Sequence, residues 1–169
     1  ESTNTVAQAG RRGALMLTLR VDHPDIEDFI LIKNDPMRLK VQYANISVLA
    51  TDEFMEAVIN DQDFDLRWGG KVYKTLKARG LWNKIIRNAH ASAEPGVIFW
   101  DRTKACHNVE YINPLSSTNP CGEQPLASYT ACNLGNINLL RCVREDGSFD
   151  QEDLKRTTRI ATRFMENVI

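Results

Sequence analysis

Three residues at alternating positions carry groups that could act together on one small molecule: the amide of Asn119, the thiol of Cys121 and the carboxylate of Glu123. In an extended or tightly looped backbone, residues two apart point to the same side, so these groups can converge. A carboxylate can accept a proton from a substrate hydroxyl while a thiol does separate chemistry. The pattern indicates a catalytic site, and the alternative is a surface turn that happens to contain Cys and Glu.

The residues between these groups favour the tip of a loop. Pro120 fixes its φ angle and has no N–H to donate, and Gly122 allows a sharp turn and the close approach of a ligand to the backbone. A segment that contains both residues does not readily continue a helix or a central strand. We therefore expect residues 117–123 to form a loop that presents the thiol.

A second candidate cysteine follows this loop. Cys132 lies in a segment where apolar residues surround Asn and Gly. Cys121 and Cys132 would also suit a thiol-disulfide oxidoreductase, although such proteins usually carry Cys-x-x-Cys. The other two of the four cysteines, Cys106 and Cys142, complete no closely spaced pair of the kind found in structural zinc sites, so we expect no bound metal.

Two segments resemble the active-site finger loop of ribonucleotide reductases. They read Asn-Pro-Cys-Gly-Glu-Gln-Pro-Leu at residues 119–126 and Cys-Asn-Leu-Gly at residues 132–135. The Pro-Cys-Gly-Glu-Gln-Pro-Leu form is most similar to the adenosylcobalamin-dependent class II enzymes. Further segments resemble the same family in the expected order, at residues 8–16, 19–26, 45–48 and 94–99.

The order of apolar and polar segments predicts alternating strands and helices, and hence an α/β sheet with helices outside. We expect strands at residues 14–21, 40–49, 64–68, 71–75 and 97–100, with a hairpin turn at Gly69-Gly70. Helices should follow Asp22, Thr51 and Asp150 as N-caps, and another should contain Trp82. Residues 103–117 lack a periodic pattern, and we expect them to be irregular.

The resemblance implies a more specific fold, a ten-stranded α/β barrel with a central finger loop that carries the active-site cysteine. A catalytic chain of this family is several times longer than the present one. We therefore expect residues 1–169 to be a partial catalytic barrel domain, incomplete at both ends.

The resemblance also implies an activity, the radical-based reduction of ribonucleoside diphosphates or triphosphates to deoxyribonucleotides. Cys121 would form the thiyl radical that takes the 3′-hydrogen of the ribose, Glu123 would accept the proton of the 3′-hydroxyl, and Asn119 would hydrogen-bond the sugar. Cys132 would be one of two thiols that supply electrons, with its partner upstream of residue 1. The alternatives are a class I large subunit, which uses a separate radical-generating subunit, and a fragment that is inactive alone and serves as an assembly module of a split enzyme.

Near the start of the chain, Gln8, Gly10, Arg11 and Arg12 resemble part of the family's specificity loop. Guanidinium groups offer bidentate donors to phosphates or base edges, and glycine lets the backbone approach a ligand closely. The resemblance implies that this loop relays the identity of a bound effector to the choice of substrate base. A solvated turn is the alternative.

The resemblance implies adenosylcobalamin as the cofactor. As partners it implies a ribonucleotide substrate, deoxynucleotide and ATP effectors, a thioredoxin-like reductant, the remainder of the catalytic chain and a second copy in a homodimer. The composition, 43% hydrophobic and 25% charged with a net charge of −1, lacks the basic excess of nucleic-acid-binding proteins. No apolar run comes close to the length of about 18 residues that is needed to span a bilayer. Residues 1–5 do not resemble a signal peptide. We therefore expect a cytoplasmic enzyme that binds neither nucleic acid nor membranes.

Overall fold

The computed structural model describes residues 7–8, 11–34, 41 and 44–168. The predictions for Gly10 and for residues 40, 42 and 43 of the expected strand at 40–49 fall outside the described residues. The chain divides into two compact units, Glu1–Ser128 and Tyr129–Ile169. No helix among the described residues is long and apolar enough to cross a membrane.

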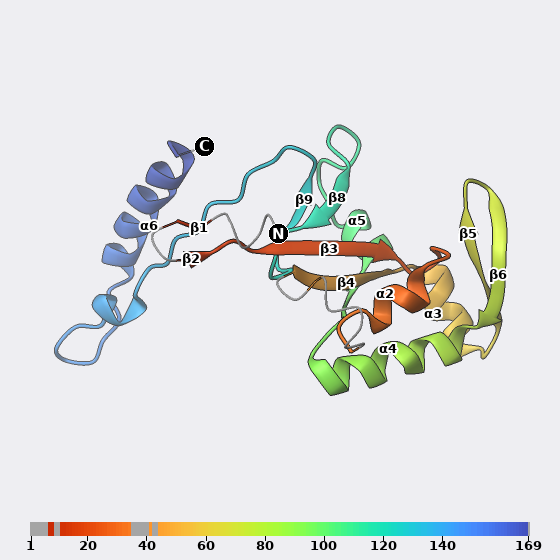
Figure 1. Ribbon diagram of the computed structural model, residues 1–169. Helices are drawn as coiled ribbons and strands as arrows, with labels where there is room; N and C mark the ends of the chain where they lie inside the picture. The colour runs from red at the N-terminus through yellow and green to blue at the C-terminus, as the bar shows by residue number, and fades with distance from the viewer. Residues whose placement is uncertain (1–6, 9–10, 35–40, 42–43, 169) are drawn as a thin grey trace. The chain divides into compact units, whose positions relative to one another are not determined.

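A three-stranded parallel sheet forms the centre of the first unit (Figure 1). Its order is β3 (Leu15–Arg20), β4 (Ala44–Ala50) and β7 (Gly96–Phe99). Parallel neighbours need a connection that crosses over the sheet. That connection includes α2 (Ile26–Leu31) between β3 and β4, and α3 (Asp52–Ile59) and α4 (Ala78–Ser92) between β4 and β7. The predicted α/β arrangement is confirmed for this unit.

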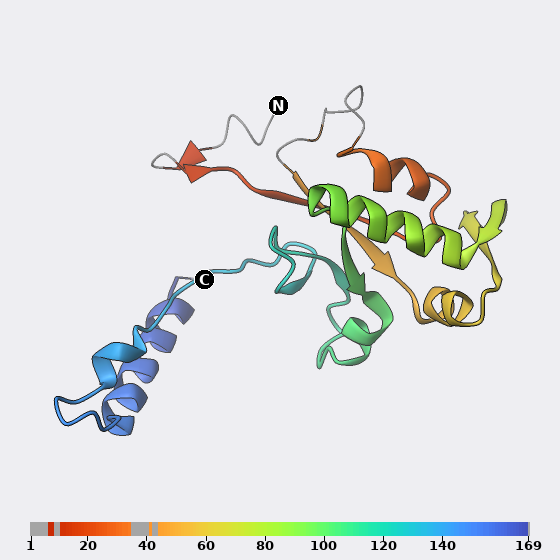
Figure 2. The same ribbon diagram turned by 90° about the horizontal axis from the view of Figure 1, so that it is seen from below.

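Both faces of the sheet are covered. Helices α2, α3 and α4 lie on one face (Figures 1 and 2), where Val48 of β4 joins a core with Phe54. Side chains alternate along a strand, so Leu49 points to the other face, where it packs with Trp100 and Leu115. Burial on both faces explains why β4 is almost continuously apolar in sequence.

A hairpin lies between α3 and α4, formed by β5 (Asp63–Trp68) and β6 (Lys71–Lys77). Gly69 and Gly70 make its turn with φ angles of 57° and 76°, in the left-handed region that favours glycine. Phe64 and Leu66 of β5 are buried in the same core as residues of α2, α3 and α4. The hairpin predicted at the two glycines is confirmed, and its second strand extends to Lys77.

One of the two N-caps predicted in this unit is confirmed. The Thr51 Oγ1 accepts a hydrogen bond from the Phe54 N–H at 3.1 Å and caps α3. The prediction for Asp22 is wrong, because its carboxylate accepts two hydrogen bonds from the Arg20 guanidinium at 2.9 and 2.7 Å. Helix α2 begins later, at Ile26, without a side-chain cap. A bidentate pair with arginine competes effectively with capping for a carboxylate.

The segment after β7 contains more regular structure than expected. Helix α5 (Trp100–Ala105) follows β7 directly, and β8 (Leu115–Thr118) pairs with β9 (Pro125–Ala127). The prediction that the strand includes Trp100 is therefore wrong, because Trp100 begins α5. The prediction of an irregular segment at residues 103–117 is wrong where this segment contains the end of α5 and the start of β8. Trp100 is buried with Leu49 and Leu115, so packing between distant segments sets the point where the strand ends.

The second unit contains a short 3₁₀ helix, η2 (Leu139–Cys142), and a long helix, α6 (Gln151–Glu166). The Asp150 side chain accepts a hydrogen bond from the Asp153 N–H at 2.9 Å, which confirms the predicted cap of this helix. None of the α6 side chains is buried, and Ile160 and Phe164 are exposed.

Candidate active-site turn

The predicted loop is the tip of the hairpin between β8 and β9, and we call residues 119–124 the Cys121 turn. The Gly122 N–H donates to the Asn119 carbonyl at 3.0 Å, and the Asn119 N–H donates to the Gln124 carbonyl at 3.1 Å. Asn, Pro and Gly at the first, second and fourth positions are residues that a type I β-turn prefers. The φ angle of Gly122 is 86°, which glycine adopts without strain. The expected loop tip is confirmed for residues 119–123, whereas Ser117 and Thr118 belong to strand β8.

Asn119, Cys121 and Glu123 all lie within this turn, and the side chains of Cys121 and Glu123 are exposed. The Asn119 Oδ1 accepts a hydrogen bond from the Gln124 N–H at 2.9 Å, so this oxygen closes the turn. Its Nδ2 donates to none of the residues that the structure describes. The turn therefore presents a thiol, a carboxylate and an amide donor on five successive residues.

Two strands of the sheet contact the hairpin that carries the turn. The Thr18 hydroxyl of β3 lies 3.2 Å from the Ser117 hydroxyl of β8, two residues before the turn begins. The Asn45 amide of β4 donates to the Pro120 carbonyl, within the turn itself. Neither Thr18 nor Asn45 was predicted as a site residue. A signal for Asn45 exists in the sequence, since it is a polar residue in a strand whose other members are apolar or small.

Cys132, the predicted redox partner, lies in the second unit and is exposed. The neighbouring Asn133 Nδ2 donates to the Met165 carbonyl near the end of α6 at 2.7 Å. A Cβ on Gly135 would lie 3.2 Å from the Met165 sulfur, so this segment contacts the helix closely. Helix α6 thus holds the backbone beside Cys132, and the partnership of Cys132 with Cys121 stays a prediction.

The predicted specificity loop forms a short antiparallel pairing. β1 (Ala7–Gln8) pairs with β2 (Arg11–Arg12), with Gln8 opposite Arg11. The contact of Gln8, Arg11 and Arg12 with an effector stays a prediction.

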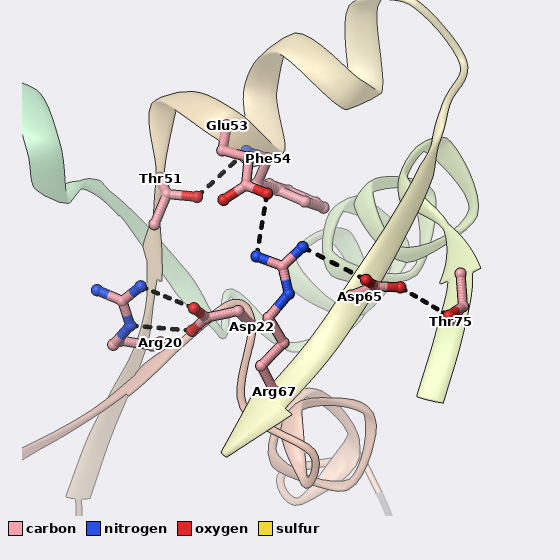
Figure 3. Close-up of polar contacts among 8 residues, drawn as sticks. All are labelled: Arg20, Asp22, Thr51, Glu53, Phe54, Asp65, Arg67 and Thr75. Carbon is pink, nitrogen blue, oxygen red and sulfur yellow. Dashed lines mark hydrogen bonds and ion pairs between the residues drawn. The ribbon is translucent and has the colours of Figure 1, made fainter. Parts of the chain in front are cut away.

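A cavity of about 570 Å³ lies at the other end of the sheet, where β3 ends. Its lining includes Arg20, Asp22, Arg67 and Trp68, and no residue of the Cys121 turn. Figure 3 shows that Arg20 faces Asp22 across two hydrogen bonds. These bonds raise the pKa of Arg20 above its ordinary value.

Arg67 in the same cavity is also paired with carboxylates (Figure 3). Its guanidinium nitrogens lie 3.3 Å from Glu53 and 3.3 Å from Asp65. Asp65 also accepts a hydrogen bond from the Thr75 hydroxyl at 2.6 Å, and this bond, followed by Arg67, lowers the pKa of Asp65. Both arginines are thus neutralised by neighbours, which indicates a structural network rather than a phosphate site.

Comparison with known proteins gives one consistent result. Residues 1–169 match the family model described as "Ribonucleotide reductase, barrel domain". The chain is 42% identical over 171 residues to a vitamin B12-dependent ribonucleoside-diphosphate reductase of Thermoplasma acidophilum, covering 99% of this chain and 22% of that protein. It is 37% identical to the protein of the same name in Mycobacterium tuberculosis, covering 99% of this chain and 24% of that protein. The chain therefore spans about a quarter or less of the length of these relatives.

Proposed function

The chain belongs to the ribonucleotide reductase family, as part of its barrel domain, and from this premise we propose that Cys121 carries the thiyl radical that reduces ribonucleotides to deoxyribonucleotides. The observation that carries the proposal is the Cys121 turn, in which an exposed thiol shares one tight turn with Asn119 and Glu123. The relatives are named ribonucleoside-diphosphate reductases, so we propose a ribonucleoside diphosphate as the substrate.

Each residue of the turn has a role that matches its chemistry. Loss of the 2′-hydroxyl requires a radical on the ribose, because acid–base chemistry alone does not make that carbon a good electrophile. The Cys121 thiyl takes the hydrogen atom from C3′, since S–H and ribose C–H bonds are close in strength. The Glu123 carboxylate accepts the proton of the 3′-hydroxyl, and the Nδ2 of Asn119 donates to a sugar oxygen.

Two further thiols supply the electrons. Over one turnover they are oxidised to a disulfide, the 2′-hydroxyl leaves as water and a hydrogen takes its place, and the hydrogen atom held by Cys121 returns to C3′. We propose Cys132 as one of these two thiols, with its partner elsewhere in the full-length protein. A thioredoxin-like dithiol then reduces the disulfide.

We propose adenosylcobalamin as the cofactor, because the relatives are named vitamin B12-dependent. When bound, this cofactor supplies the radical chemistry. The cavity of about 570 Å³ contains no residue of the Cys121 turn, so it does not fit a group that must act on Cys121.

We further propose how the enzyme is regulated and assembled. Deoxynucleotides and ATP act as effectors, and Gln8, Arg11 and Arg12 transmit their identity to the choice of substrate base. The remainder of the catalytic chain completes the ten-stranded barrel, and the enzyme works as a homodimer in the cytoplasm.

The test compares Cys121→Ser with Cys106→Ser in the full-length protein. Both thiols are exposed in the first unit, but Cys106 has no role in the mechanism. With adenosylcobalamin and a dithiol present, we expect Cys121→Ser to form no detectable deoxyribonucleotide and Cys106→Ser to keep wild-type turnover. Substantial turnover by Cys121→Ser would refute the thiyl assignment. Wild-type turnover that needs a separate subunit instead of adenosylcobalamin would favour the class I alternative.

A further inference from the structure

We infer that Asn45 of β4 is a positioning residue for Cys121, which it holds in register through the backbone of the Cys121 turn. This inference rests on the proposed function. The Asn45 Nδ2 donates to the Pro120 carbonyl oxygen, a contact that joins residues 75 positions apart. The carbonyl of Pro120 belongs to the same planar peptide group as the nitrogen and Cα of Cys121. A hydrogen bond to that oxygen therefore restrains the plane from which the Cys121 side chain projects.

The strand that supplies Asn45 is itself firmly held. Asn45 lies opposite Met16 in the ladder with β3, and its neighbours Ala44 and Ile46 are buried. The Ile46 N–H donates to the Glu94 carboxylate at 2.9 Å, and the second oxygen of Glu94 lies 2.9 Å from the Lys33 ammonium. Asn45 itself is exposed, and its amide reaches the turn through the hydrogen bond to Pro120.

The other contacts of the turn act at different points. Thr18 and Ser117 join β3 to β8, two residues before the Cys121 turn. The bonds of Asn119 with Gly122 and Gln124 are internal to the turn and set its shape, not its place on the sheet. Among the described hydrogen bonds, the contact of Asn45 is the one that links the tip of the turn to the sheet. Without it the hairpin keeps its pairing, but its tip can shift relative to β4.

A shift of the tip should act on the chemical step. Hydrogen transfer from C3′ requires the sulfur to lie at one position relative to the ribose, and a displacement of about 1 Å can lower a rate about 100-fold. Substrate binding depends on other groups as well and should change less. The inference thus predicts a loss in kcat with little change in KM.

The experiment uses Asn45→Ala in the full-length protein, with a 3′-deuterated and an unlabelled ribonucleotide as substrates. We expect kcat to fall about 10- to 100-fold, with KM within a factor of about three. We also expect a larger 3′-deuterium isotope effect on kcat, because the displaced sulfur makes hydrogen transfer more rate-limiting. A variant that merely lowered the amount of folded enzyme would leave the isotope effect unchanged. Amide hydrogen exchange at residues 119–124 should become faster, while exchange in β4 and β7 stays as in wild type.

The matched control is Asn34→Ala. Asn34 also donates through its side-chain amide, to the Asn88 Oδ1 at 2.6 Å, in the same unit but away from the turn. We expect this variant to keep the wild-type kcat and isotope effect. If Asn45→Ala failed to fold, Asn45→Asp would carry the same test, because it keeps the shape of the side chain and removes the donor.

The possible results separate the inference from the function on which it rests. A folded Asn45 variant with wild-type kcat, isotope effect and exchange at residues 119–124 would overturn the positioning role. A wild-type protein that reduced no ribonucleotide would overturn the proposed function instead. Faster exchange in the turn with unchanged kcat would also refute the inference, since the turn would then move without consequence for the reaction.

Discussion

Asn119 serves both the structure and the proposed chemistry of the Cys121 turn. Its Oδ1 accepts from the Gln124 N–H at 2.9 Å and helps to close the turn, while its Nδ2 is the proposed donor to the substrate. An alanine at this position would remove both contributions at once. The two halves of the amide must therefore be tested by different substitutions.

We predict that Asn119→Asp separates the two roles. Aspartate keeps an acceptor for the Gln124 N–H and replaces the Nδ2 donor by an oxygen. Hydrogen exchange in the turn should stay as in wild type, while kcat/KM for the ribonucleotide should fall about tenfold, since a hydrogen bond contributes about 0.5–1.5 kcal/mol. Asn119→Ala should show the same loss together with faster exchange at residues 119–124. Wild-type kcat/KM in the aspartate variant would contradict the role of Nδ2.

At the scale of elements, the pairing of β4 with β7 depends on a position that has no side chain. Gly96 lies opposite Ser47 in the parallel ladder, and a Cβ on Gly96 would lie only 2.7 Å from the Ser47 Oγ. Ser47 is buried in the central strand. Close-packed interiors transmit such a clash instead of absorbing it, so the residue at position 96 controls how closely the two strands approach.

We predict that Gly96→Ala lowers the free energy of unfolding by about 1–3 kcal/mol. Adding Ser47→Ala should restore most of that loss, because it removes the clashing oxygen and leaves the Ser47 Cβ at 3.7 Å, an ordinary contact distance. Thermal unfolding of the full-length protein measures both variants. As a control, Gly80→Ala in helix α4 meets only the Lys77 Cβ at 3.8 Å and should be neutral or stabilising. A double variant as unstable as Gly96→Ala would show that the clash is not the cause.

At the scale of the molecule, charge links separate elements of the first unit. The Glu27 carboxylate on α2 accepts hydrogen bonds from Lys74 on β6 and from Lys84 on α4, the latter at 2.5 Å. Lys74, followed by Lys84, lowers the pKa of Glu27 below its ordinary value of 4.5. One carboxylate therefore connects α2, strand β6 of the hairpin and α4. These ion pairs lie at the surface, where each contributes little to the free energy of unfolding.

We predict that Glu27→Gln destabilises the protein by about 1 kcal/mol at neutral pH and by much less in acid. The folded pKa is lowered, so the stabilisation by Glu27 is fully present above its unfolded pKa and is lost as the pH falls through the folded pKa. Urea unfolding of wild type and variant at pH 7, 5 and 3 measures the difference. We expect the two proteins to converge at the lowest pH. A difference that stayed constant with pH would show that lost packing, and not charge, is responsible.

The sequence by itself determined the local features of this protein. Pro120 and Gly122 predicted the loop tip, two adjacent glycines predicted the hairpin between β5 and β6, and Thr51 predicted the start of α3. The alternation of strands and helices predicted the α/β class, and the spacing of Asn119, Cys121 and Glu123 predicted the candidate site. These features follow from the conformational limits of single residues and from hydrogen bonds between close neighbours, which a sequence contains directly.

Only the tertiary structure decided how these pieces are held. It placed Asn45 against a turn 75 residues away and Thr18 against a strand 99 residues away. It also paired Asp22 with Arg20 and buried Trp100 at the start of a helix instead of the end of a strand. In each case a side chain has several locally acceptable partners or conformations that differ little in free energy. Burial and hydrogen bonds from distant segments select one of them, and they exist only once the sheet has formed.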